Sequence, residues 1–469
     1  MHDHTYLFYD IETTGLNKCF DQVLQFAAIR TNESLSEIDR HEFQIKLNPD
    51  VIPSPYAIIT HRIGVSDFSK GLSEYEAVQK IHALLNHPGT ISVGYNSLGF
   101  DDEFLRFSFY KNLLPPYTHQ FANGCGRMDI YPITLLYSLF KKELLNWPEG
   151  NLKLENINAA NQLHKGQAHN AMVDVEVTLA LARKLIQDKT LWSFIIDYFG
   201  KKTDGTRLHH CDTHLKIGDD DYKIGLMVNG KIGTASGYIA PVIELGMHAH
   251  YKNQLLWLRL DDEQLLKTKI DTIKATTRVF KKRLAEPPIF LPLKDRYLSL
   301  LSDERQQKMV MSKKWLMEHV DLFRAIQTFH QEAKYPEIKE RDCDAALYDI
   351  GFSTPAEEKL FRQFHAAAPS EKMLIAKKFP NKIRREQALR IIARHFPDFL
   401  SSEDKVIFEH YRTANPVDFR GEKKLTVEQA MSEIEKIKLE KKLDAEQIQL
   451  LNDLLYQYEK KYDSRSWIV

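Results

Sequence analysis

The chain has 469 residues, with 64 Lys and Arg against 64 Asp and Glu, so its formal net charge is zero. Hydrophobic residues make up 43% and charged residues 27%, the balance of a globular protein whose length suggests two or three domains. Zero net charge excludes a polycation that coats nucleic acid with its whole surface, so any polyanionic partner must be held by local clusters of Lys and Arg.

The start of the chain and its cysteines bear on where the protein works. The sequence MHDHTYLFYD lacks a basic region followed by an apolar stretch, and the longest apolar windows, such as Leu191 to Phe199, contain charged residues. We therefore expect neither a secretory signal nor a membrane span. The four cysteines have no C-x-x-C spacing, which predicts reduced thiols in a cytoplasmic protein rather than a zinc site; they are Cys19, Cys125, Cys211 and Cys343.

The first 190 residues are predicted to form an α/β unit. Short β-prone runs alternate with segments whose apolar residues have helical spacing, which indicates a mixed sheet covered by helices. The expected strands are Thr5–Tyr9, Leu24–Thr31, His41–Leu47 and Thr90–Tyr95, and the expected helices are Ser73–Leu85, Asp102–Leu114, Lys153–Leu163 and Ala171–Ile186.

Two further regions follow. The sequence FGKKTDGT at Phe199–Thr206 indicates a linker, and a small β-rich domain with helical inserts is expected after it. Its expected strands are Tyr222–Val228, Lys231–Ala235, Gln254–Leu260 and Pro288–Leu293. A helical region begins near Asp344, in which Thr354 starts one helix with a capping box and Asp444 starts another; from there the chain is expected to be helical to its end.

The segment YLFYDIETTG carries the first candidate site residues. An apolar strand runs into Asp10 and Glu12, and positions two apart on a strand point the same way, so both carboxylates leave one face within reach of one ion. An Asp-x-Glu pair alone is weak evidence, because a chain this acidic contains several by chance. The apolar strand before it and Thr-Thr-Gly after it make chance a poorer explanation.

Two more segments carry candidate site residues, each with a simpler reading. Asp101 opens a helical pattern, where an acid that complements the helix dipole is common. In AHNAMVD, Asn170 is a plausible N-cap, so His169 lies just outside a helix and Asp174 one turn inside it. Alone, His169 is more often an ordinary surface histidine and Asp174 a solvated helix acid.

Together these segments give the order Asp-x-Glu, Asp, His-x4-Asp, which resembles the signature of the DEDD exonuclease superfamily in its histidine variant. The chemistry explains the residue types. Two Mg²⁺ ions about 4 Å apart can stabilise the attacking and leaving oxygens of phosphodiester hydrolysis, and Mg²⁺ prefers carboxylate oxygens. A histidine beside the metals can remove a proton from the attacking water near neutral pH.

Over essentially its whole length the sequence also resembles the bacterial exodeoxyribonuclease I family. The resemblance rests on motifs in all three regions: Gln25–Thr31, Gly94-Tyr95-Asn96 before the Phe-Asp-Asp step, Asn146–Glu149, Ile239-Ala240-Pro241 after Tyr238, Ala346-Leu347-Tyr348 with Gly351-Phe352, and Ala393–Pro397. It implies an RNase H-like exonuclease domain (1–190), an SH3-like domain (200–343) and a helical C-terminal domain (344–469).

The resemblance further implies an activity and a site. The activity is Mg²⁺-dependent, processive 3′→5′ degradation of single-stranded DNA to nucleoside 5′-monophosphates in repair and recombination, with Mn²⁺ able to substitute. The implied partners are single-stranded DNA and the C-terminal tail of single-stranded-DNA-binding protein, and the implied state is a monomer. Asp10, Glu12 and Asp174 are the implied metal ligands, Asp101 is the fourth acid, and His169 is the general base; Glu12 also lies near the terminal 3′-hydroxyl.

DNA contacts are implied at eight further positions. These are Arg106, Tyr117, Phe121 and Lys153 in the first domain, and Phe194, Lys201, Tyr238 and Asn253 along the route between domains. Lys153 departs from the family, which has Arg there, so the charge is kept but the bidentate phosphate fork is lost. For Phe194 considered alone, ordinary packing is the simpler reading.

Two local clusters of positive charge stand out, at Lys267–Arg283 and Lys377–Arg394. Each is either a solvated helix face or part of a groove that tracks phosphates. Two rival functions also stay open. One is an exoribonuclease with the same five groups, and the other is a non-catalytic module that binds single strands. Roughly 280 residues follow the first domain, and they argue against the exoribonuclease and for a long strand enclosed by the extra domains.

Overall fold

The expected mixed sheet is present in the computed structural model, which describes residues 4–463. The strand order is β3-β2-β1-β4-β5, and β1 pairs antiparallel with β2 and parallel with β4. The strands are β1 Thr5–Thr13, β2 Val23–Thr31, β3 Glu37–Gln44, β4 Thr90–Gly94 and β5 Gly126–Asp129. β1 continues four residues beyond the predicted Tyr9, so Asp10 and Glu12 lie within the strand.

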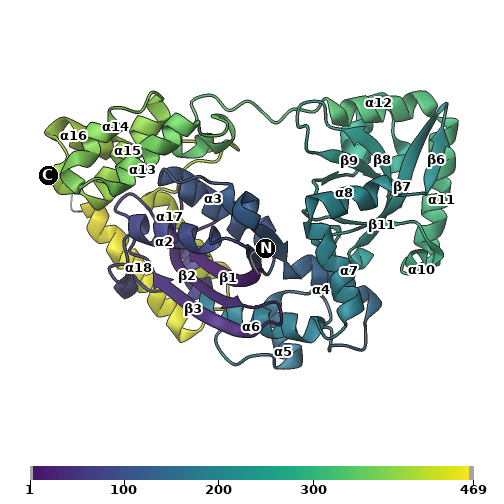
Figure 1. Cartoon of the computed structure of the whole chain (residues 1–469), viewed down its shortest axis with the longest axis horizontal. Helices are drawn as coiled ribbons and strands as arrows, with labels where there is room; N and C mark the ends of the chain where they lie inside the picture. The colour runs from purple at the N-terminus through teal and green to yellow at the C-terminus, as the bar shows by residue number, and fades with distance from the viewer. Residues whose placement is uncertain (1–3, 464–469) are drawn as a thin grey trace. The chain divides into compact units, whose positions relative to one another are not determined.

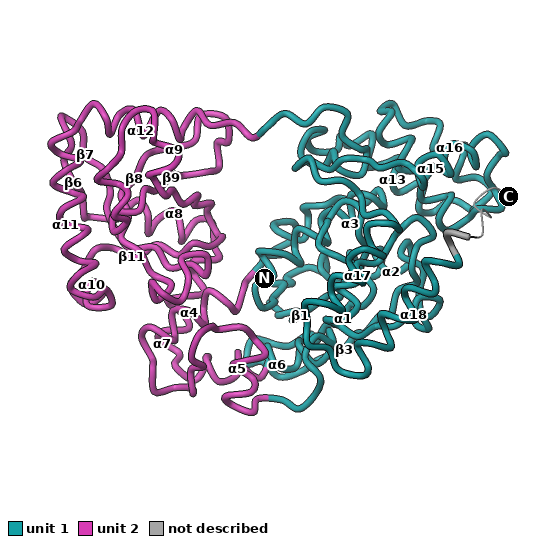
Figure 2. Tube along the Cα trace, turned by 180° about the vertical axis from the view of Figure 1, so that it is seen from behind, with its two compact units in different colours: residues 1–127, 164–179, 336–469 teal, residues 128–163, 180–335 magenta. Residues whose placement is uncertain are grey.

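The chain divides into two compact units, shown in different colours in Figure 2. Unit 1 takes in residues 1–127, 164–179 and 336–469, and unit 2 takes in residues 128–163 and 180–335. The chain passes between the units four times: in β5, between residues 163 and 164, in helix α6 (Ala171–Leu185), and between residues 335 and 336. No helix in the described part of the chain is long and apolar enough to cross a bilayer.

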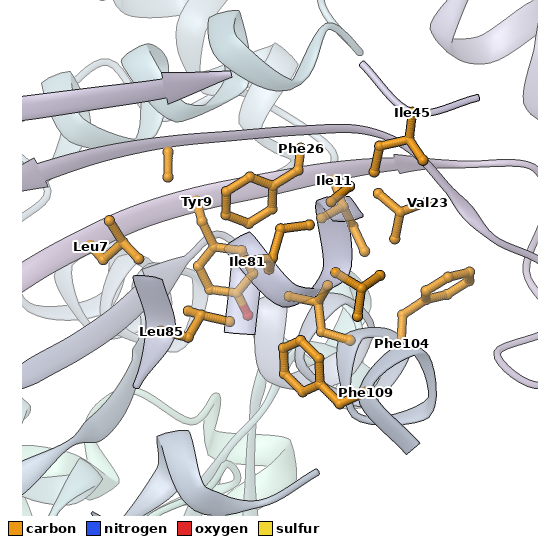
Figure 3. Packing of buried hydrophobic residues seen from close by; sticks show 14 residues of the cluster. Leu7, Tyr9, Ile11, Val23, Phe26, Ile45, Ile81, Leu85, Phe104 and Phe109 are labelled. Atoms are coloured by element: carbon orange, nitrogen blue, oxygen red, sulfur yellow. The ribbon is translucent and has the colours of Figure 1, made fainter. Parts of the chain in front are cut away.

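The core of unit 1 decides which way the acids of β1 point. Leu7, Tyr9 and Ile11 are buried on the side of the sheet that carries α2 (Glu74–Leu85) and α3 (Asp101–Lys111), where Phe104 and Phe109 of α3 join the same cluster (Figure 3). Side chains alternate along a strand, so the residues between them leave the opposite face. Burial of one apolar row therefore directs Asp10 and Glu12 to the other side of β1.

The residues after Asp344 are helical, as predicted, and this helical region is part of unit 1. Its helices are α13 Pro355–Ala366, α14 Lys372–Ala376, α15 Lys382–His395, α16 Ser402–Thr413, α17 Val427–Glu440 and α18 Ala445–Asp463. Thr354 closes the predicted capping box of α13, and Asp444 caps α18 through the backbone N–H of Gln447 at 2.9 Å. The predicted helix over 464–469 falls outside the described residues. Apolar residues of α17 and α18 pack on α1 (Pro55–His61), which joins this region to the sheet.

Unit 2 contains a second, largely antiparallel sheet with helices around it (Figure 1). Its order is β10-β9-β8-β7-β11, with β6 paired to β7. The strands are β6 His214–Ile217, β7 Asp220–Val228, β8 Ile239–Met247, β9 Leu255–Arg259, β10 Val279–Lys282 and β11 Ile289–Pro292. The helices are α4 Ile130–Phe140, α5 Leu154–Asn161, α7 Lys189–Ile196, α8 Lys201–His209, α9 Ile273–Thr276, α10 Asp295–Leu298, α11 Asp303–Glu318 and α12 Val320–Gln331.

Two predictions in this region are wrong. The expected linker at 199–206 contains most of α8, whose Asp204 is fully buried and accepts a hydrogen bond from Lys282 Nζ at 2.6 Å. A buried ion pair therefore fixes a segment whose Gly and charged residues suggested exposure. The expected strand Lys231–Ala235 consists of two 3₁₀ turns, and the missed strand β8 follows them.

Candidate active site

The end of β1 places two of the five predicted residues. Glu12 lies opposite Gln25 of β2, and the pairing register shifts between Glu12 and Thr13. Such an irregularity bends a strand and re-aims the side chains beside it. The chain is held in this bend by Thr13 Oγ1, which donates to the carbonyl of Gly15 at 2.8 Å.

Asp101 stands at the first position of α3 and is 7% exposed. Its neighbour Asp102 is locked in place by three cationic or imidazole groups: His119 Nε2 at 2.9 Å, Arg127 Nη1 at 2.7 Å and Arg106 Nε at 3.2 Å. The charges of Arg127 and Arg106 and the hydrogen bond from His119 hold the pKa of Asp102 well below its ordinary value, although burial opposes them. This network fixes the backbone that carries Asp101.

His169 and Asp174 are placed by the N-terminus of α6. Asn170 accepts from the backbone N–H of Val173 at 3.3 Å, so it caps the helix as predicted. The backbone N–H of His169 donates to Asp174 Oδ2 at 3.1 Å, and the φ of His169 is 64°. The N–H of Ala171 donates to Gln25 Oε1 at 3.2 Å, which joins this helix end to the strand opposite Glu12.

The structure brings the five predicted residues together. Ligand atoms of Glu12, His169 and Asp174 lie within 4.8 Å of one another. Burial, followed by the charges of Asp101, Glu12 and Asp174, raises the pKa of Asp10 well above its ordinary value. Burial with the charges of Asp174 and Asp101 raises the pKa of Glu12 to about 9.

The raised pKa values of Asp10 and Glu12 bear on whether these residues could hold a metal ion. Four carboxyl groups that are half-buried or buried repel one another, which adds to the effect of burial on the pKa of Asp10 and Glu12. A divalent cation would remove that repulsion, and carboxylate oxygens are the donors that hard cations such as Mg²⁺ prefer. The donor set therefore fits an oxygen-bound divalent metal site.

A second histidine adjoins the cluster and was not predicted. His61, the last residue of α1, is 5% exposed, and its Nδ1 accepts from the backbone N–H of Ile63 at 3.0 Å. Burial, with the charge of His169, lowers the pKa of His61 to about 4, although the hydrogen bond with the Thr13 backbone opposes this shift. A lone histidine at the end of a short helix gives no sequence signal for this position.

Two of the predicted DNA-contact residues of unit 1, Tyr117 and Phe121, line one small pocket of about 90 Å³. The Tyr117 ring lies 5.8 Å from the Arg106 guanidinium and 5.4 Å, edge to face, from Phe352. Phe121 is 60% exposed, whereas the Arg106 side chain is 13% exposed because it pairs with Asp102. The Phe121 ring is thus open to a ligand, whereas Tyr117 is half-buried and Arg106 presents little of its charge to solvent.

The remaining predicted DNA-contact residues belong to unit 2. Lys153 precedes α5, and its side chain is 69% exposed. The backbone of the neighbouring Leu152 forms a hydrogen bond with the Tyr238 hydroxyl. Phe194 is 39% exposed, and the guanidinium of Arg207 lies 4.3 Å from its ring centroid. The other two are Lys201, at the start of α8, and Asn253, and both are exposed.

Neither positive cluster is a simple helix face. In the second cluster, Arg390 binds Asp342 and Asp344, and Arg394 binds Asp50 at 2.8 Å, all with little exposure. Those arginines hold unit 1 together and are unavailable to a polyanion. The first cluster runs through turns, α9 and β10; Lys282 is buried against Asp204, and the lysines left exposed are Lys267, Lys269, Lys274 and Lys281.

Comparison with known proteins also indicates an exonuclease. A family model described as Exonuclease matches residues 7–182, and one described as Exonuclease I C-terminal domain matches residues 341–462. The exodeoxyribonuclease I of Haemophilus influenzae is 27% identical over 475 residues, covering 93% of this chain and 97% of that protein. That of Buchnera aphidicola (subspecies Acyrthosiphon pisum) is 30% identical over 295 residues, covering 61% of this chain and 69% of that protein.

Solved structures show the same fold over the whole chain. Escherichia coli exonuclease I, in a zinc-bound complex with single-stranded DNA, superposes with a TM-score of 0.84 at 24% identity. The match covers 98% of this chain and 99% of that one. The mixed sheet, the second sheet and the C-terminal helices therefore belong to one known architecture, with an RNase H-like exonuclease domain at its start.

Proposed function

Because the chain belongs to the exodeoxyribonuclease I family, we propose that it degrades single-stranded DNA from the 3′ end and releases nucleoside 5′-monophosphates. The class of enzyme is a phosphodiester hydrolase of the exonuclease type. The observation that carries the finer proposal is the convergence of Asp10, Glu12, Asp101, His169 and Asp174 from three separate segments. No structural purpose requires four carboxyl groups to be crowded at such a cost in repulsion.

The proposed roles follow from the positions of these groups. Asp10, Glu12 and Asp174 would hold divalent metal, with Asp101 as the fourth acid. Two bound Mg²⁺ ions would stabilise negative charge on the attacking and leaving oxygens. His169 would accept the proton of the attacking water, and its place in the loop before α6, tied to Asp174 through the backbone, would keep it beside that water.

The choice of DNA as substrate rests on the relatives. Solved structures of Escherichia coli exonuclease I contain single-stranded DNA, and this chain matches those proteins from end to end. The exposed ring of Phe121 suits a strand whose bases are unpaired, because stacking does not depend on base identity. We propose that the other predicted contacts serve the same strand; they are Arg106, Lys153, Phe194, Lys201, Tyr238 and Asn253.

The proposal extends to domains, partners and location. Residues 1–190, 200–343 and 344–469 would act as exonuclease, SH3-like and helical domains. A solved exonuclease I structure is a complex with single-stranded-DNA-binding protein, and the tail of that protein is the proposed protein partner here. We propose a monomer that works in the cytoplasm in DNA repair, with Mn²⁺ able to replace Mg²⁺. All four cysteines are buried free thiols, in keeping with a reducing compartment.

A time course with end-labelled DNA tests this function. The purified chain is mixed with single- and double-stranded DNA labelled at either end, with and without Mg²⁺, and an RNA strand of equal length is run beside them. We expect mononucleotides from the single strand only when Mg²⁺ is present, and immediate release of a 3′ label while a 5′ label stays on shortening strands.

Three results would contradict the proposal. Release of the 5′ label first would reverse the polarity, and faster loss of RNA than of DNA would favour the exoribonuclease. Tight binding of the strand without any release of nucleotides in Mg²⁺ or Mn²⁺ would favour a non-catalytic module.

A further inference from the structure

The bend at the end of β1, residues 13–15, is held by hydrogen bonds from another part of unit 1; we call it the β1 bend. Its middle residue, Thr14, is fully buried, and its carbonyl accepts from the backbone N–H of Ser54 at 2.6 Å. The Thr14 N–H donates to the carbonyl of Gln22 at 2.9 Å, and Thr14 Oγ1 donates to Asp21 Oδ1 at 2.8 Å. Gln22 and Asp21 belong to the loop just before β2, so the bond from Ser54 is the one that ties the bend to a more distant segment.

Pro53 and Ser54 are in turn held by two C-terminal helices. Tyr458 of α18 is fully buried, and its hydroxyl donates to the carbonyl of Pro53. Ser54 Oγ donates to Glu433 Oε2 of α17 at 3.5 Å. The next residue begins α1, which packs with α17 and α18 in one apolar cluster (Figure 2). One peptide group therefore gives its carbonyl to α18 and its N–H to the β1 bend.

This shared peptide group couples α18 to the acids of β1. A peptide group is planar and rigid, and its C=O and N–H point opposite ways, so a rotation that moves the carbonyl also moves the N–H. Hydrogen bonds in such a chain also strengthen one another. A cavity of about 510 Å³ is lined by Ser54 and Glu433, so directional bonds rather than close packing fix the peptide on that side.

The direction of Glu12 depends on the β1 bend. Glu12 is two residues before Thr14, and the pairing of β1 with β2 shifts register directly after Glu12. Beyond that shift the regular ladder no longer sets where the side chains point, so the bonds to the bend take over this role.

We propose that Tyr458 is a positioning residue for the proposed metal site. Its hydroxyl fixes the peptide between Pro53 and Ser54, this peptide fixes the β1 bend, and the bend aims Glu12. The inference rests on the proposed function, since the metal site is the catalytic centre of that function. It gives the C-terminal helices a part in the chemical step.

The test compares three variants of the full chain. Tyr458→Phe removes the hydroxyl and keeps the ring. Ser54→Pro removes the N–H at the other end of the same peptide, and the φ of Ser54, −72°, is one that proline adopts. The control is Ile437→Val, because Ile437 is fully buried in the apolar cluster of α17 and α18 but its side chain cannot hydrogen-bond the peptide. Losing a buried methyl group and losing a hydrogen bond destabilise proteins by similar amounts, which thermal melting checks.

Three measurements separate positioning from stability and from DNA binding. They are the single-turnover rate in Mg²⁺, the affinity for Mn²⁺ by calorimetry, and the affinity for oligo-dT in EDTA. We expect Tyr458→Phe to lower the rate about 10-fold and to weaken Mn²⁺ binding, because a misplacement of about 1 Å can cost about 100-fold in rate. Its oligo-dT affinity should stay within about 2-fold of wild type, as should all three values for Ile437→Val.

The double variant shows whether Tyr458 acts through the shared peptide. Ser54→Pro should lower the rate at least as much as Tyr458→Phe does, and combining the two should add no further loss, since both break the same connection.

Several results would overturn the inference. They are a wild-type rate and Mn²⁺ affinity in Tyr458→Phe, an equal loss in Ile437→Val, a loss of oligo-dT affinity as large as the loss of rate, and independent losses that multiply in the double variant. Failure of the proposed function is seen separately, because wild type would then release no nucleotides in Mg²⁺. The Mn²⁺ affinities of Tyr458→Phe and Ile437→Val would still decide whether Tyr458 positions the metal site.

Discussion

Replacing Asp174 with Asn is expected to lower nucleotide release from single-stranded DNA by at least about 10³-fold while the protein stays folded. Asn keeps the shape of the side chain and an oxygen that can accept from the His169 N–H, so the loop before α6 should stay in place. It removes one of the charges that the metal site requires. The measurement is the initial rate of mononucleotide release in Mg²⁺, with circular dichroism to check the fold. Asp10→Ala should have a similar effect on the rate.

The chain offers a matched control two residues away. Glu176 lies on the same helix and binds Arg40 and His164 instead of the acidic cluster. Glu176→Gln should therefore leave the rate within about 2-fold of wild type, because surface ion pairs contribute little. Undiminished release by Asp174→Asn, or an equal loss by Glu176→Gln, would refute the assignment of Asp174 as a metal ligand.

Replacing His169 with Asn is expected to lower turnover by about 10²- to 10⁴-fold and to change DNA affinity little. The φ of 64° at this position is unfavourable for most side chains, and Asn tolerates it best after Gly, so the substitution isolates loss of the imidazole. Single-turnover rates in Mg²⁺ and oligo-dT affinity in EDTA separate chemistry from binding.

His164 provides the comparison for this variant. It precedes the same helix and pairs with Glu176 at 2.8 Å, outside the acidic cluster. His164→Asn should keep the wild-type rate. If His169→Asn loses affinity and rate in equal measure, the residue binds the strand and is not the general base.

Much of the candidate site follows from local sequence rules. The spacing of Asp10 and Glu12 with the alternation of a strand places both acids on one face, and the N-cap Asn170 places His169 and Asp174 at a helix start. Each of these inferences depends on a few adjacent residues. That the segments converge was inferred from family resemblance, since no local pattern states that α6 is tied to β2 through Gln25.

The errors arise where partners are distant in sequence. Counting charges included Arg390 and Arg394 in the cluster Lys377–Arg394, but Arg394 pairs with Asp50, which no local window includes. Strand β8 was missed because Pro241 and Gly246 are both unfavourable within a strand. Its neighbours β7 and β9 supply the hydrogen bonds that make it a strand.

Calorimetric titration of Mn²⁺ into the metal-free protein shows most directly whether the converging acids bind divalent cations. Burial and mutual repulsion raise the pKa of Asp10 well above its ordinary value and the pKa of Glu12 to about 9, so the metal-free cluster holds protons near pH 7. The cation must displace those protons, so affinity should rise from pH 6 to pH 8 with release of protons to the buffer. Asp174→Asn should weaken binding at least about 10-fold and Glu176→Gln should not. Equal Mn²⁺ affinity in wild type and Asp174→Asn, or binding that does not strengthen as pH rises, would contradict the account.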